Sequence, residues 1–151
     1  HPGKDDKNNC DLNKIIETII NFIKNKYPYK IQIVSDFSEL PMLLGQPQHL
    51  SQVFMNLLVN AADSIKDTGT ITVKTFVEKN KVIVKISDTG SGIPENIKLK
   101  IFDPFFTTKE VGKGTGLGLS IVYKILKNHN ADIYFESVVN KGTIFFIEFP
   151  I

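Results

Sequence analysis

Hydrophobic positions recur every three or four residues in three stretches of the chain, over 12–26, 47–66 and 117–129. This spacing places apolar side chains on one face of a helix and predicts three amphipathic helices. Asp11 is a suitable N-cap for the first of them, and Asn130 is a suitable residue to end the third.

Extended segments lie between and after these helices. Alternation of apolar and polar residues predicts five strands, over 30–35, 70–77, 81–87, 132–138 and 143–149. The resulting order of elements does not alternate as in a doubly wound fold. It predicts an α/β two-layer sandwich, in which a mixed sheet carries about three helices on one face.

Domain boundaries follow from the same pattern. Residues 11–151 form the predicted domain, and 1–10 are a polar linker remnant. Residues 88–116 are glycine-rich and lack a clear period. A loop of this length is usually functional, for example as a lid over a ligand, or else disordered.

Composition narrows the possibilities. A chain of 151 residues fits one domain, which buries roughly 70% of its unfolded surface at this size. No apolar run approaches the length of a membrane helix, and the single cysteine, Cys10, makes a reducing, cytoplasmic setting the default. The net charge of +2 does not indicate nucleic-acid binding. All 18 basic residues are lysine, so a bound phosphate would need lysine, backbone N–H groups or a metal.

A polar stripe adjoins the apolar face of the helix over 47–66. It consists of His49, Gln52, Asn56, Asn60 and Asp63. A solvated helix side is the ordinary explanation, but two asparagines one turn apart are poor helix formers. Their amide oxygens suit a hard cation that also has phosphate ligands. We interpret the stripe as one wall of a site.

Two loop motifs carry further candidate chemistry. Asp88 ends a predicted strand and is followed by Gly90 and Gly92, which is either an ordinary turn or a carboxylate beside a pocket open to a flat ring. The segment FDPFFTTK at 102–109 contains three phenylalanines. These are either a satellite of the core or plugs that pack when a lid closes.

Four alternating glycines at 112–118 run directly into the third predicted helix. Glycine permits close backbone approach, and a helix N-terminus offers N–H groups to an anion. The run is not a Walker motif, because Lys113 is followed by Gly114 and not by Ser or Thr. It is not a Rossmann fingerprint either, because no βαβ unit surrounds it. Lys109 and Lys113 can supply positive charge.

Together these motifs resemble the ATP-binding catalytic domain of bacterial sensor histidine kinases, whose Bergerat fold is shared with gyrase B, Hsp90 and MutL. The matching segments are QVFMNLLVNAADSI (52–65), DTGSGIP (88–94), FDPFFTTK (102–109), GKGTGLGLS (112–120) and GTIFFIEFP (142–150). The stretch from FFTTK to GTGLGLS is particularly similar to nitrogen-sensor and sporulation kinases.

The resemblance implies binding of ATP and Mg²⁺. Asp88 is expected to bond the adenine amine, with Thr143 near the same edge, and Asn60 to ligate the metal. Asn56, Lys109 and Lys113 are expected to act on the phosphates during transfer. The implied nucleotide-binding residues are Asn56, Asn60, Asp63, Asp88, Gly90, Gly92, Ile93, Phe102, Thr107, Lys109, Gly112, Lys113, Gly114, Thr115, Gly116, Leu117, Gly118, Leu119 and Thr143.

One position separates the branches of this superfamily. Gyrase B, Hsp90 and MutL have a glutamate that activates water, and Asn56 stands at that position here. An amide is not a general base, so we expect slow hydrolysis and transfer to an incoming imidazole. Family departures at Gln46, His49 and 130–131 concern helix ends more than the nucleotide.

The acceptor histidine of such kinases is not recognisable in this sequence. His1 precedes no helix, His49 lies in the second helix, and His129 near a helix C-terminus suits a partly charged imidazole. We therefore expect a catalytic fragment whose partners are a histidine-bearing dimerisation domain of the same parent and, indirectly, a response regulator. The fragment would be monomeric and the parent a homodimer, and the sequence leaves open whether the parent is anchored at the inner face of the membrane. Two alternatives are a gyrase- or Hsp90-type ATPase and a serine-kinase module such as an anti-sigma factor.

Overall fold

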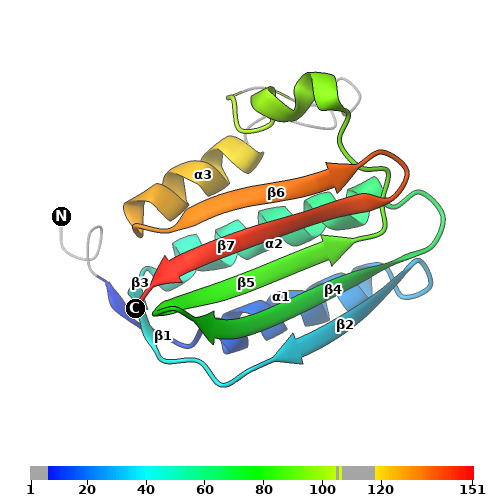
Figure 1. The fold of residues 1–151 in the computed structure, drawn as a ribbon. Helices are drawn as coiled ribbons and strands as arrows, with labels where there is room; N and C mark the ends of the chain where they lie inside the picture. The colour runs from blue at the N-terminus through cyan, green and yellow to red at the C-terminus, as the bar shows by residue number, and fades with distance from the viewer. Residues whose placement is uncertain (1–6, 105, 107–117) are drawn as a thin grey trace.

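A computed structural model describes residues 7–104, 106 and 118–151 as a layer of helices on a five-stranded sheet (Figure 1). The sheet order is β2 (Ile31–Phe37), β4 (Gly69–Glu78), β5 (Lys81–Asp88), β7 (Gly142–Pro150) and β6 (Asp132–Val138). The β2 and β4 strands run parallel and the other neighbours antiparallel, so the sheet is mixed. One face is covered by α1 (Leu12–Lys26), α2 (Pro47–Ser64) and α3 (Gly118–Asn128). The predicted two-layer α/β sandwich is confirmed.

Local chemistry explains where the outer helices begin and end. The Asp11 carboxylate accepts a bond from the Lys14 N–H at 3.2 Å and caps α1, as predicted. Asn130 has a φ of 56° just beyond α3. The Ala131 N–H bonds the Leu126 carbonyl at 2.8 Å, which completes a Schellman-type ending.

The core lies between the helices and the sheet, with α2 in the middle of the helical layer (Figure 1). Burial of one large apolar side chain contributes about 1.5–3 kcal/mol, so the apolar face of α2 anchors the fold. Its buried members are Leu50, Val53, Phe54, Leu57, Leu58, Ala61 and Ala62.

Two short elements differ from the sequence interpretation. Asn8–Cys10, expected to be linker, forms β1 and pairs antiparallel with β3 (Leu43–Gly45). Glu95–Lys100, inside the segment expected to be irregular, forms the 3-10 helix η1. Such short elements show no hydrophobic period, and β1 depends on a partner distant in sequence.

His129 links the end of α3 to the start of α2. Its Nδ1 lies 2.9 Å from the Ile125 carbonyl, and its Nε2 accepts the Gln46 N–H at 3.0 Å. Only a neutral ring can donate with one nitrogen and accept with the other. Burial lowers the pKa of His129, so the expectation of a partly charged imidazole was wrong.

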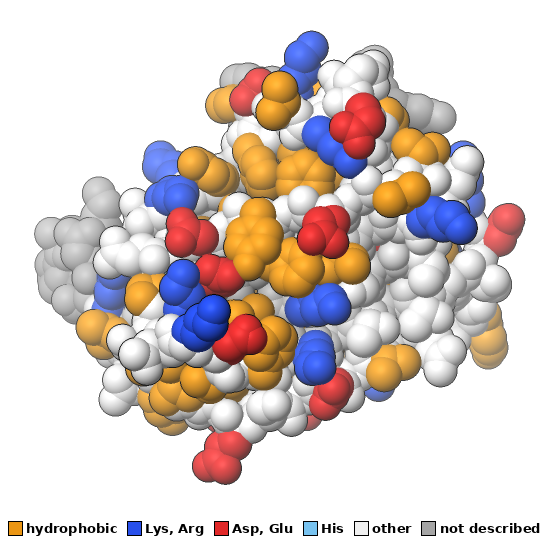
Figure 2. Space-filling view, viewed as in Figure 1, with side chains coloured by type: hydrophobic (Ala, Val, Ile, Leu, Met, Phe, Trp, Pro, Cys, Tyr) orange, Lys and Arg blue, Asp and Glu red, His pale blue; other side chains and the backbone are white. Residues whose placement is uncertain are grey.

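None of the described helices covers the opposite face of the sheet, where hydrophobic and charged side chains are interspersed (Figure 2). Tyr134 stacks on Phe146 with ring centroids 5.1 Å apart, and Lys81 pairs with Glu148 at 3.1 Å. The Tyr134 hydroxyl also bonds Glu148, which raises the pKa of Tyr134 to about 12. None of the helices in the described part of the chain has the length and apolar character to cross a bilayer.

Candidate functional site

A row of buried polar side chains crosses the sheet at the carboxyl end of β5. The strand register places Asp88 opposite Thr143 and Thr143 opposite Ser137. Directly opposed residues project on the same face, which here is the helix-covered face. Asp88, Thr143 and Ser137 are 9%, 5% and 8% exposed. Buried polar groups require hydrogen-bond partners, and this row supplies several of them internally.

Asp88 contacts three neighbouring elements. Its Oδ1 accepts the Gly90 N–H at 2.8 Å and lies 3.3 Å from the Ser64 hydroxyl, which shares its single proton with the Ala61 carbonyl at 2.7 Å. The backbone N–H of Thr143 donates to the same carboxylate. Burial raises the pKa of Asp88, and these hydrogen bonds partly oppose the increase. The result is a fixed, largely desolvated acceptor at a strand end.

Two glycines permit the close packing around Asp88. A Cβ added at Gly90 would lie 1.9 Å from Ser64 Oγ and 2.8 Å from the Ser64 carbonyl oxygen. Gly142 has a φ of +132°, and a Cβ there would lie 1.9 Å from the Asp88 carbonyl oxygen. The end of α2 and the turn between β6 and β7 therefore both press directly against the Asp88 segment.

The loop after Asp88 is bonded on both sides. The Ser91 N–H donates to the Ser64 carbonyl at 3.0 Å, and the Asn140 N–H donates to the Ser91 carbonyl at 2.8 Å. Thr89 joins the start of β4, because its hydroxyl accepts the Thr70 N–H at 2.9 Å. Hydrogen bonds within the protein therefore fix the conformation of this half of the site.

One face of α2 connects Asp88 to the beginning of α3. Asn56 Nδ2 donates to the Gly118 carbonyl at 3.3 Å, two turns before Ser64. Asn60 lies midway between Asn56 and Ser64 and is half-buried, as Asn56 is. Positions eight residues apart on a helix are separated by about 12 Å along its axis. The other members of the predicted stripe are exposed: His49, Gln52 and Asp63.

Comparison with known proteins identifies this arrangement. Residues 45–151 match the family model described as histidine kinase-, DNA gyrase B-, and HSP90-like ATPase. The chain belongs to this family. It is 47% identical over 122 residues to sensor kinase CckA of Brucella abortus and 44% identical over 106 residues to sporulation kinase A of Bacillus subtilis. These matches cover 71% and 70% of the chain but only 13% and 17% of those proteins.

Solved structures agree. The nucleotide-free catalytic domain of histidine kinase ThkA has a TM-score of 0.84 at 32% identity, with 96% of this chain and 95% of that chain covered. ThkA in complex with response regulator protein TrrA has a TM-score of 0.79 at 29% identity and covers 95% of this chain and 41% of that one. This chain is the ATP-binding catalytic domain of a two-component sensor histidine kinase.

The structure brings several of the predicted residues of this kinase domain together. Asp88, Gly90, Ile93 and Thr143 form one cluster, since the Ile93 N–H bonds Ser137 next to Thr143. Gly92 lies against the carbonyl of Val138 on the same side.

Two predicted residues make contacts with the core instead. Phe102 packs between Tyr123 and Phe135, with ring centroids 5.6 and 6.1 Å away, as a satellite of the core. Leu119 also packs against the core. The remaining predicted residues lie outside the described residues: Thr107, Lys109, Gly112, Lys113, Gly114, Thr115, Gly116 and Leu117.

Sequence reasoning missed Ser64 and Ser137. Ser137 stands at an inward position of β6, where Ile133 and Phe135 precede it at the same alternation. A hydroxyl at such a position signals a buried polar contact. Ser64 gave no comparable signal, because its contact with Asp88 arises only where α2 meets β5.

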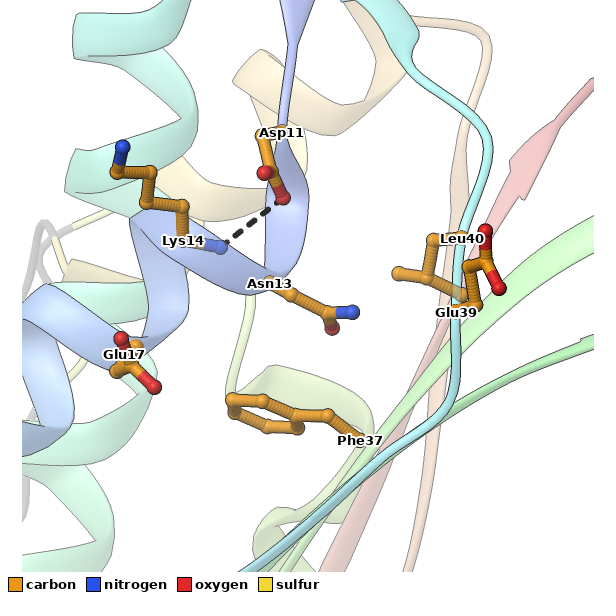
Figure 3. Close-up of a pocket in the computed structure, with 7 residues that line it drawn as sticks. All are labelled: Asp11, Asn13, Lys14, Glu17, Phe37, Glu39 and Leu40. Carbon is orange, nitrogen blue, oxygen red and sulfur yellow. Dashed lines mark hydrogen bonds between the residues drawn. The ribbon is translucent and has the colours of Figure 1, made fainter.

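One cavity on the described surface lies away from this site. A cavity of about 370 Å³ is lined from α1 and the segment after β2, and Asp11, Asn13 and Phe37 border it (Figure 3). Phe37 pairs with Thr75 in the second half of β4, whereas Asp88 pairs with Ile71 near the start of that strand. This cavity is therefore toward the opposite end of the sheet from the Asp88 row.

Proposed function

We propose that this catalytic domain binds Mg·ATP along the face of α2 and transfers the γ-phosphoryl group to a histidine on a separate dimerisation domain. One observation carries the proposal. The same helix face touches the buried Asp88 carboxylate through Ser64 and the start of α3 through Asn56, with Asn60 between them. A base-binding end and a phosphate-binding end are thereby held at a fixed separation.

The Asp88 end suits adenine. A desolvated carboxylate that is already oriented by the backbone N–H groups of Gly90 and Thr143 is a strong acceptor for an exocyclic amine. A carbonyl at the same ring position would face it with an unfavourable oxygen–oxygen contact. We therefore expect preference for adenine over guanine nucleotides.

The other end suits phosphate and a metal ion. The Asn60 amide oxygen is a ligand that Mg²⁺ accepts when phosphate oxygens supply most of the remaining shell. When bound, the ion would neutralise phosphate charge. Backbone N–H groups at the beginning of α3, with Lys109, Lys113, Gly114 and Gly116 before it, would hold the phosphates. Gly118, the first residue of α3, would share this role.

Asn56 favours transfer over hydrolysis. Its amide donates to the Gly118 carbonyl, so it is engaged in holding the start of α3 and has no carboxylate with which to activate water. Phosphoryl transfer depends mainly on positioning and charge stabilisation, which a site without its own base can provide. The γ-phosphoryl group would remain for an incoming imidazole.

The partners follow from this chemistry. The acceptor would be the dimerisation domain of the same homodimeric parent, and the phosphoryl group would then pass to a response regulator. The crystallised complex of ThkA, at 29% identity, with response regulator protein TrrA supports a response regulator as a partner. We place the domain on the cytoplasmic side, where ATP is available.

Calorimetry with a non-hydrolysable ATP analogue and Mg²⁺ tests the metal role. Asn60→Ala should weaken binding at least about tenfold, because a metal ligand is lost, and abolish acid-labile phosphate on an added histidine-bearing dimerisation domain. Asn25→Ala makes the same change on an exposed position of α1 and should alter neither. Unchanged transfer by Asn60→Ala would remove the metal assignment.

Asp88→Asn tests the adenine role and separates it from stability. Replacing an acceptor oxygen by an amine should weaken the ATP analogue by about ten- to a hundredfold. Because the pKa of Asp88 is raised in the folded protein, its contribution to stability is present at low pH and lost as the pH rises through the folded pKa. Urea unfolding should show Asp88→Asn at least as stable as the parent at pH 7, with this advantage shrinking in acid. Equal ATP and GTP affinity in the parent would contradict the adenine role.

A further inference from the structure

Ser137 makes three hydrogen-bonding contacts beside the proposed base-binding end. Its Oγ lies 2.7 Å from the Ile93 N, 3.1 Å from the Gly142 carbonyl oxygen and 2.8 Å from Thr143 Oγ1. The first partner comes from the loop after β5, and the other two are the first two residues of β7. Ser137 and Thr143 are both buried, so water does not compete freely for these groups.

Donor and acceptor counting gives one proton arrangement in which all three contacts are hydrogen bonds at the same time. A serine hydroxyl has one proton to donate and two lone pairs to accept with. The Gly142 carbonyl can only accept, so the Ser137 proton must point to it for that contact to be a hydrogen bond. The Ile93 N–H can only donate, and it takes one lone pair. The contact with Thr143 can then be a bond only if Thr143 donates its proton to Ser137.

This arrangement leaves Thr143 as a pure acceptor. Its proton is committed to Ser137, and the rest of its hydroxyl oxygen offers lone pairs. Thr143 lies directly opposite Asp88 in the strand register, and the two side chains share a face. Two acceptors therefore lie side by side, and Thr143 can accept a hydrogen bond from the base directly or through an ordered water.

We propose that Ser137 is a positioning residue for purine selection: by taking the Thr143 proton, it makes Thr143 a second acceptor that favours the adenine amine and disfavours the guanine carbonyl. The inference rests on the proposed adenine site and assigns it a residue that does not itself touch the base. Without Ser137, the Thr143 hydroxyl rotates and its proton becomes available to a carbonyl.

The test compares affinities of the 151-residue chain for non-hydrolysable ATP and GTP analogues, both with Mg²⁺. Ser137→Ala should reduce the ATP-to-GTP affinity ratio about tenfold, the usual effect of one redirected hydrogen bond. This ratio is independent of the fraction of folded protein, because partial unfolding weakens both analogues alike. A merely structural role for Ser137 would therefore leave the ratio unchanged.

A double-mutant cycle gives the decisive comparison. Thr143→Val keeps the shape and the backbone N–H but removes the hydroxyl, so it should lower the ratio by itself. Adding Ser137→Ala to Thr143→Val should then change the ratio no further. Ser87→Ala, on the opposite face of β5, is the matched control and should retain the parent ratio.

The measured affinity ratios distinguish a failure of the role given to Ser137 from a failure of the adenine site. A parent-like ratio in Ser137→Ala, or a full additional effect in the Thr143→Val background, overturns the role of Ser137 and leaves the adenine site standing. Equal affinity of the unchanged protein for both analogues overturns the adenine site, and the inference with it.

Discussion

At the scale of single residues, Gly90 has a different structural role from the one that its motif suggests. Sequence reasoning took Gly90 as a gap that admits a flat ring. In the structure, Gly90 is buried, its N–H donates to Asp88, and its α-carbon faces Ser64 at the end of α2. The absence of a side chain lets the helix end reach the carboxylate.

Gly90→Ala should therefore destabilise the fold. The new Cβ would meet the Ser64 carbonyl oxygen at 2.8 Å, and backbone cannot rotate away as a side chain can. We expect a loss of about 1–3 kcal/mol in the free energy of unfolding, measured by urea denaturation. Gly118→Ala is the control, because no described atom lies within 4 Å of a Cβ there and alanine favours a helix. Equal stability of the two variants would show that the Gly90 contact relaxes at little cost.

At the scale of elements, hydrogen bonds join both ends of α3 to α2 or to the residue that precedes α2. Asn56 bonds the Gly118 carbonyl at the start of α3, and His129 accepts the Gln46 N–H just beyond its end. The helix that would present N–H groups to the phosphates is thus held to the helix that would carry the metal ligand. The His129 link works only with a neutral ring.

His129 predicts a loss of stability in mild acid. Its folded pKa is lowered, chiefly by burial and further by Lys7 and His49, while the Ile125 carbonyl opposes the decrease. A lowered histidine pKa means that its stabilisation is full above the unfolded pKa, about 6.5, and is lost as the pH falls through the folded value. Urea unfolding between about pH 7.5 and 5.5 should show this slope.

The slope should be reduced in His129→Gln, whose amide does not titrate, and mostly retained in His49→Gln, because His49 makes the smallest of these contributions to the pKa of His129. An identical pH dependence in the parent and in His129→Gln would assign the effect to other groups.

At the scale of the whole molecule, segments that are distant in sequence pack together at each end of the sheet. The turn between β6 and β7 presses on the Asp88 segment at one end. At the other end β1 pairs with β3 and brings Cys10, 3% exposed, into the core. Residues 8–10 therefore belong to the folded unit, although the sequence interpretation began the domain at 11.

The reactivity of Cys10 therefore shows whether β1 stays paired with β3. Burial raises the pKa of its thiol, and only the thiolate reacts readily with alkylating reagents. We expect iodoacetamide to modify native Cys10 at least about a hundredfold more slowly than the same chain in denaturant. Comparable rates would mean that β1 detaches without global unfolding.

The sequence alone determined the elements with strong local patterns. The first helix was predicted over 12–26 and is Leu12–Lys26, and the Asp11 cap and the end of the third helix near Asn130 were also predicted. Such features depend on neighbouring residues, through periodicity and backbone geometry. The five matching segments and their order indicated the family, and the nucleotide-contact roles given to them stay predictions.

Only the tertiary structure decided which polar groups meet. The register that aligns Asp88, Thr143 and Ser137, and the approach of Ser64 to Asp88, join residues far apart in the chain. A shift of one residue in strand pairing would turn these side chains to the opposite face, and no local pattern specifies the pairing by itself. Packing of the sheet against α2 excludes such a shift, because it would turn the apolar side chains of the strand away from the core.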